Sequence, residues 1–131
     1  MAAEKQFENK VKKYLEGRGC WILKYWGGAA YTKSGIPDLL VCANNNFIAV
    51  ELKAPNGEPS LLQLYHLDKI RKAKGYGILL YPKDFENFKG FMEDPTQGNS
   101  WYLDNIEEQY RWKIKLEQRR EKHENDQRRT D

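Results

Sequence analysis

Three charged residues stand at the ends of two apolar stretches that have the composition of β-strands. Asp38 opens the stretch DLLVCA, and Glu51 and Lys53 end the stretch FIAVELK. Charged side chains are rarely buried in a sheet unless they are paired. Two carboxylates are suitable ligands for a divalent cation such as Mg²⁺, which keeps several waters and leaves room for a phosphate oxygen. The residue types therefore indicate a metal site that accepts a phosphate group, provided that the fold brings them together.

The asparagines between the two stretches predict how the strands pair. Asparagine tolerates the positive φ of a two-residue hairpin turn, and Asn44 and Asn45 are placed to form one. The Cβ atoms of residues that face each other across such a hairpin lie about 5 Å apart. Two carboxylates at that separation repel one another unless a cation lies between them. The predicted register pairs Cys42 with Phe47, Leu40 with Ala49 and Asp38 with Glu51.

Lys53 follows Glu51 on the same face of its strand, close enough to join the carboxylates. A surface ion cluster with solvent-exposed partners is the alternative explanation for these charges.

The elements that would hold this hairpin follow from hydrophobic periodicity and from glycine and proline breaks. Ser60 and Gln63 have the spacing of a capping box at the start of one helix. The sequence predicts an α/β fold with the order α-β-β-β-α-β-α around a small mixed sheet. The predicted helices are residues 4–17, 61–74 and 84–92, and the predicted strands are residues 20–26, 38–43, 47–53 and 76–82.

The chain changes character after residue 92, which divides it into a globular domain of residues 1–92 and a linker with a charged helix or tail over residues 93–131. Ile106, Tyr110 and Ile114 have helical spacing, and Trp112 and Leu116 lie beside them. No apolar residue follows Leu116. A solvated helix end or tail is the simplest interpretation. A helix that binds a partner or dimerises is the alternative.

Composition limits the class of protein. A chain of 131 residues with 40% hydrophobic residues and a net charge of +3 is long enough for one folded domain and only mildly basic. No apolar stretch has the length of a membrane span, and the N-terminal residues lack the apolar run of a signal peptide. Cys20 and Cys42 have no metal-ligand spacing. We expect both cysteines to be buried thiols of a cytoplasmic protein.

The stretch GIPDLLV…FIAVELKAPNGEPSLLQ resembles the PD-(D/E)XK nucleases. Within that superfamily it is most similar to the VRR-NUC group, which is related to phage and archaeal Holliday-junction resolvases. The resemblance covers about residues 4–90 and includes the order of the elements. It implies a restriction-endonuclease-like core with a C-terminal helical extension outside it.

The resemblance also implies roles for individual residues. Asp38, Glu51 and the main-chain carbonyl of Leu52 would be ligands of Mg²⁺ or Mn²⁺. Lys53 would be the catalytic lysine, and Gln63 would help to arrange the site. Related resolvases carry an outer glutamate ligand on the first helix. Glu8 fits that position best, and Glu4 is the alternative.

A glycine-rich loop before Asp38 has the composition of a DNA contact. Basic and aromatic side chains on such a loop suit phosphate contacts and base stacking. The alternative is a core tryptophan followed by an ordinary loop. The expected DNA-binding residues are Lys24, Trp26, Tyr31, Lys33 and Ser34.

The resemblance predicts a metal-dependent endonuclease selective for branched DNA such as Holliday junctions. The compact, single-module chain indicates a phage or bacterial origin, so we expect the protein in the cytoplasm of a bacterial or phage-infected cell. Symmetric cutting of a junction predicts a homodimer, with an interface at Tyr76–Tyr81 or near Ile106. Other readings remain open. The nuclease could act on linear, nicked or single-stranded DNA, the fold could be an inactive DNA-binding module, or the charged tail could be the functional part of an interaction protein.

Overall fold

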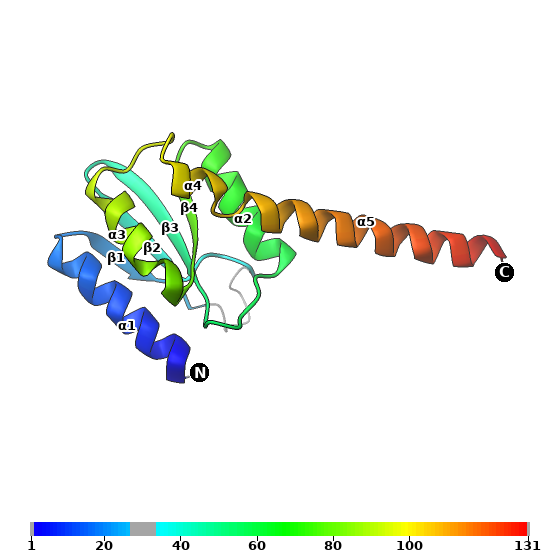
Figure 1. The fold of residues 1–131 in the computed structure, drawn as a ribbon, viewed down its shortest axis with the longest axis horizontal. Coiled ribbons are helices and arrows are strands. Elements are labelled where there is room, and N and C mark those ends of the chain that lie inside the picture. Colours follow the sequence, from blue (N-terminus) through cyan, green and yellow to red (C-terminus); the bar gives the residue numbers. More distant parts are fainter. Residues whose placement is uncertain (1, 27–33, 131) are drawn as a thin grey trace.

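The computed structural model describes residues 2–26 and 34–130. It has a four-stranded sheet between helices, from which one long helix projects (Figure 1). The predicted order of the elements is confirmed, with boundaries that differ by a few residues. The elements are α1 (Ala2–Gly17), β1 (Trp21–Lys24), β2 (Leu39–Ala43), β3 (Asn46–Leu52), α2 (Leu61–Lys72), β4 (Tyr76–Leu80), a 3-10 turn (Pro82–Asp84), α3 (Phe85–Glu93), α4 (Ser100–Asp104) and α5 (Glu107–Thr130).

The sheet has the strand order β1-β2-β3-β4, in which the first three strands are antiparallel and β4 is parallel to β3. Asn44 and Asn45 have φ angles of 49° and 68°, as a two-residue hairpin turn requires. The β2–β3 ladder pairs Cys42 with Phe47 and Leu40 with Ala49, so the predicted register is confirmed. Its last pair is Leu39 with Val50, and the same register places the next residues, Asp38 and Glu51, opposite each other.

Each face of the sheet has its own apolar cluster. Ile48, Val50 and Leu52 point to the face that α1 and α3 cover. On the opposite face Leu64 and Leu67 of α2 pack with β4 and the start of α5. Because side chains alternate along a strand, Glu51 belongs to the α2 face, between two residues of the other face. The strand that carries Glu51 is therefore buried on both sides.

Gly77 allows α2 to approach β4 closely. A Cβ atom at Gly77 would lie 2.5 Å from the carbonyl oxygen of Leu67 and 3.0 Å from its Cα. We expect Gly77→Ala to lower the free energy of unfolding by about 1–3 kcal/mol, because backbone atoms cannot rotate out of the way. Urea unfolding measures the change. Gly90→Ala in α3 is the matched control, since no atom lies within 4 Å of its new methyl group, and alanine should stabilise this helix by about 0.5–1 kcal/mol. Equal stability of Gly77→Ala and the wild type would contradict this account of the α2–β4 contact.

The C-terminal extension begins as part of the packed structure. Asn105, between α4 and α5, accepts a hydrogen bond from Leu79 N at 2.7 Å and donates one to Leu79 O at 2.8 Å. Tyr102 of α4 accepts another from Gly77 N at 3.1 Å. These side chains occupy main-chain hydrogen-bonding groups along the outer edge of β4. Without them, these groups would be open to pairing with another strand. The predicted dimer contact through Tyr76–Tyr81 therefore finds no free strand edge.

The second half of α5 extends away from the body of the protein (Figure 1). Residues 118–129 are exposed to solvent. The expected C-terminal helix is therefore present. The division of the chain at residue 92, and the choice between a solvated helix end and a partner-binding helix, stay predictions.

The prediction for the cysteines was wrong in part. Cys20 is half-buried, but Cys42 is exposed. Leu39 and Val41 face the α1 side of the sheet, so the side chain of Cys42 points to the opposite side. The other face of the sheet at Cys42 is less covered, because α2 makes most of its sheet contacts with β4 and β3. No helix in the described part of the chain has the length and apolar character of a membrane span.

Candidate active site

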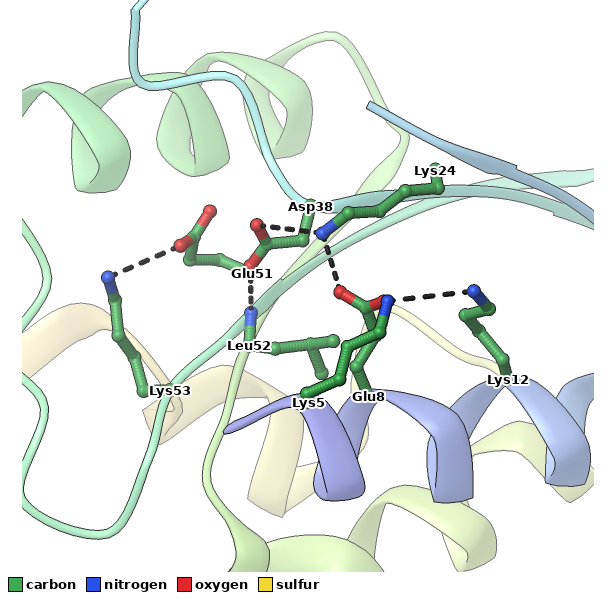
Figure 2. Close-up of polar contacts among 8 residues, drawn as sticks. All are labelled: Lys5, Glu8, Lys12, Lys24, Asp38, Glu51, Leu52 and Lys53. Carbon is green, nitrogen blue, oxygen red and sulfur yellow. Dashed lines mark hydrogen bonds and ion pairs between the residues drawn. The ribbon is translucent and has the colours of Figure 1, made fainter. Parts of the chain in front are cut away.

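Asp38 and Glu51 meet where β2 begins and β3 ends (Figure 2). The main chain at Asp38 is fixed by Tyr25, whose N–H donates to the Asp38 carbonyl at 2.9 Å. Its side chain accepts a hydrogen bond through Oδ2 from Leu52 N at 2.8 Å. The side chain of Glu51 is buried, and the residue is only 2% exposed. The hairpin thus places both carboxylates at one position, as the sequence predicted.

The environment of Glu51 disfavours its charge. Burial raises the pKa of Glu51 to about 8, and the nearby charge of Asp38 raises it as well, against the opposing effect of Lys53. Glu51 Oε1 is buried and has no hydrogen-bond partner among the described residues. A buried carboxylate oxygen without a partner is costly. A cation bound between Asp38 and Glu51 would remove that cost, so these residues fit the divalent metal ion that the sequence predicted.

Lys53 lies beside the buried carboxylate. Its Nζ is 3.4 Å from Glu51 Oε2, and its side chain is largely buried. The main chain is held by β4, because Lys53 N donates to Leu80 O at 3.0 Å. Asp38, Glu51 and Lys53 therefore form one cluster at the end of the β2–β3 hairpin (Figure 2).

Glu8 reaches this cluster from α1 through Lys24. Lys24 Nζ is 2.5 Å from Glu8 Oε1 and 3.6 Å from Asp38 Oδ1, so the lysine joins the two carboxylates (Figure 2). Burial raises the pKa of Glu8, but hydrogen bonds from Lys24 and Lys5 outweigh it and leave the pKa below its usual range. Burial lowers the pKa of Lys24, but its bond to Glu8 and the charge of Asp38 outweigh it and leave the pKa raised. Both groups are therefore charged at neutral pH.

The structure thus pairs Glu8 with lysines. Glu8 Oε2 lies 3.0 Å from Lys5 Nζ and 3.7 Å from Lys12 Nζ. No group of three or more His, Cys, Asp or Glu side chains in the described residues is arranged to hold a metal ion. Neither Lys5 nor Lys12 was expected from the sequence as a partner of Glu8, although their spacing from it, three residues before and four after, is that of ion pairs on a helix.

Gln63 was expected both in a capping box with Ser60 and in support of the carboxylate site. The Gln63 side chain accepts a hydrogen bond through Oε1 from Ser60 N at 2.8 Å, and the main-chain N–H of Gln63 donates to Ser60 Oγ at 3.1 Å. The predicted capping box is therefore present, and the Gln63 side chain serves the start of α2. Its role at the carboxylates stays a prediction.

The residues expected to contact DNA are only partly described. Tyr31 and Lys33 lie outside the described residues. Ser34 is exposed. Trp26 is also exposed, and the Nζ atoms of Lys5 and Lys24 lie 5.7 and 5.5 Å from the centre of its ring. Lys24 has the two carboxylates described above as partners, which places it in the candidate active site rather than on an open surface.

The chain is similar to a known protein family and to a solved structure. Residues 2–94 match the archaeal Holliday junction resolvase (Hjc) family. The chain belongs to this family. No curated protein matches this resolvase-family chain. A solved structure described as a VRR_NUC domain superposes with a TM-score of 0.56 at 25% sequence identity, covering 72% of this chain and 98% of that one. The resemblance to VRR-NUC and PD-(D/E)XK nucleases is therefore confirmed, and the family and fold are those of a nuclease. Helices α4 and α5 follow the residues that match the family.

Proposed function

We propose that this chain is a metal-dependent endonuclease that hydrolyses phosphodiester bonds in branched DNA. The observation that carries the proposal is the buried Glu51 carboxylate, with Asp38 opposite, Lys53 beside it and one oxygen without a partner among the described residues. Such an arrangement costs folding stability. A cost of this kind is common at catalytic sites, where charge is gathered for chemistry.

Asp38 and Glu51 would hold Mg²⁺ or Mn²⁺, with the main-chain carbonyl of Leu52 as a further ligand and Glu8 as an outer one. The ion would polarise a phosphate oxygen and acidify a water for attack on phosphorus. Leu52 N holds Asp38 Oδ2 at 2.8 Å, which fixes the direction of that carboxylate. Lys24, between Glu8 and Asp38, would have to move if Glu8 becomes a ligand.

Lys53 would stabilise the negative charge that develops on the phosphoryl group, or orient the attacking water. Its main chain is fixed by β4, and its ammonium lies 3.4 Å from Glu51. Gln63 would support the site from the start of α2. The leaving group is a 3′-oxygen, and no protein nucleophile is required.

The choice of branched DNA rests on the family, because four-way junctions, flaps, single strands and duplexes all present phosphates to such a site. DNA contacts from Lys24, Trp26, Tyr31, Lys33 and Ser34, and a homodimer that cuts two strands, are part of the proposal. The intact Asp38, Glu51 and Lys53 argue against an inactive DNA-binding module.

Cleavage of a labelled four-way junction beside a linear duplex of the same sequence tests the proposal. We expect paired nicks in the junction with Mg²⁺ or Mn²⁺ and complete loss of cleavage in EDTA, because Asp38 and Glu51 cannot polarise a phosphate without the ion. Equal cutting of both substrates would keep the nuclease and refute junction selectivity. Absence of cleavage by folded protein with either metal would refute the proposed activity.

A further inference from the structure

A cleft of about 460 Å³ lies between α5 and the loop that follows Lys53. Its size is within the usual range for small-ligand sites. Residues from three separate parts of the chain line it, and those that matter here are Gly57, Glu58, Tyr81, Lys83, Trp112 and Lys113. Trp112 and Lys113 belong to α5, beyond residues 2–94 that match the resolvase family. The family core alone therefore does not form this cleft.

Gly57 connects the cleft to the candidate active site. It lines the cleft, and a Cβ atom at Gly57 would lie 3.4 Å from Cδ of Lys53. The tip of the loop is held in place by Tyr81, whose hydroxyl donates to Gly57 O at 2.8 Å. The aliphatic stem of Lys53 thus packs against Gly57, and Gly57 is part of the cleft wall. A ligand in the cleft would therefore lie near the stem of Lys53.

Aromatic rings and ammonium groups occur together in the lining. Trp112 is 57% exposed, so its ring is accessible to a ligand in the cleft. Lys113 Nζ lies 6.0 Å from the centre of the Trp112 ring, and Lys83 Nζ lies 5.9 Å from that of Tyr81. Rings on which bases stack, with cations for the backbone, are the usual elements of a single-strand binding site.

Glu58 is the carboxylate in this lining. It pairs with Lys113 at 3.6 Å, and its side chain is 78% exposed. The Lys113 side chain is 24% exposed, so water reaches the pair mainly from the Glu58 side, and an ion pair that water screens contributes little to stability. A phosphate can therefore replace Glu58 as the partner of Lys113 without a large loss.

We propose that this cleft binds an unpaired nucleotide of the DNA strand beside the cleavage site. The base stacks on Trp112, and the flanking phosphates face Lys83 and Lys113. The inference rests on the proposed nuclease function and deepens it, because it makes unpaired nucleotides near the cut a feature that the enzyme recognises. A duplex end or a fully paired duplex offers no free base to Trp112, so the cleft discriminates between substrates that share the same metal site.

Binding measured with Trp112→Ala tests this selectivity. Two fluorescent DNAs are compared in EDTA, where the DNA is not cut: a blunt duplex, and the same duplex with one end splayed into unpaired nucleotides. Loss of one stacking contact should weaken binding of the splayed DNA about tenfold and change binding of the duplex less than twofold. Trp112→Phe should recover most of the affinity, since phenylalanine also stacks. Trp21→Ala is the matched control, because Trp21 is similarly exposed, at 61%, but lies on β1.

Crosslinking of the wild-type protein provides a second measurement that depends on no variant. With 5-iododeoxyuridine among the unpaired nucleotides, irradiation should attach the DNA to Trp112, identified by mass spectrometry of the peptide. Equal affinity of folded Trp112→Ala and wild type for the splayed DNA, or crosslinks that avoid α5, would overturn the inference. Neither result depends on cleavage. A protein that cuts junctions but fails these tests would lose only the nucleotide cleft, and one that passes them but cuts no DNA would lose only the proposed activity.

Discussion

Replacing Lys53 with methionine should slow DNA cleavage by about 10²–10³-fold, the effect typical of removing one group that stabilises developing charge. Methionine keeps an apolar stem of similar length, which retains the packing against Gly57. It removes the ammonium group 3.4 Å from Glu51 Oε2. The variant therefore separates the charge of Lys53 from its contribution to packing.

Single-turnover cleavage at saturating Mn²⁺ measures this change, with circular dichroism as the check on folding. Lys69→Met is the control, since Lys69 is an exposed lysine on α2. It should cleave at the wild-type rate. Lys53→Arg should recover little activity, because a guanidinium is planar and larger than an ammonium. If Lys53→Met cleaves within about threefold of the wild-type rate, the loss is far smaller than expected for a group that stabilises developing charge. That result would exclude Lys53 from the chemistry.

The hairpin could be predicted from the sequence because its signals are local. Two asparagines that accept positive φ set the turn, and the alternation of side chains then fixes which residues face each other. Once Cys42 pairs with Phe47, Asp38 must fall opposite Glu51. The Ser60–Gln63 capping box is equally local, since both hydrogen bonds join residues three positions apart. These two features account for the correct placement of the carboxylates and of the start of α2.

Contacts between distant segments could not be predicted in this way. The sequence marks Glu8 and Lys24 as polar, but only the packing of α1 on the sheet shows that one neutralises the other. Likewise, Asn105 lies 26 residues from Leu79, and nothing near it in the sequence indicates that it completes the edge of β4. Trp112 was predicted to lie in a helix, but the sequence did not show which surface this helix packs against. The cleft beside Lys53 became visible only when α5 was placed against the loop at Gly57.

Without metal and at alkaline pH, Glu51→Gln should be more stable than the wild type, and the substitution should abolish metal-dependent cleavage. The usual pKa of a glutamate is 4.5, and burial raises that of Glu51 to about 8 in the folded protein. Below pH 4.5 both the folded and the unfolded chain carry the proton, so the residue imposes no penalty. As the pH rises from 4.5 to 8 the unfolded chain releases the proton and the folded chain keeps it, so stability falls. Above pH 8 the penalty is complete, on the order of a few kcal/mol.

Urea unfolding in EDTA at pH 5 and at pH 8.5 measures this penalty. Wild type should lose stability relative to Glu51→Gln between the two values, since glutamine has no proton to release. Glu86→Gln is the control, because Glu86 is an exposed carboxylate on α3, and its stability should follow that of wild type at both values.

Adding Mn²⁺ at pH 8.5 should then stabilise wild type and not Glu51→Gln, because a ligand that binds only the folded state raises its stability by mass action. The same binding displaces the proton from Glu51, so it should strengthen as the pH rises. The stability that Glu51 costs the free protein would therefore be the source of the affinity for a cation that we propose for it. Identical pH dependence of unfolding in wild type and Glu51→Gln would show that Glu51 ionises normally, and it would remove the physical reason for placing a metal ion at this carboxylate.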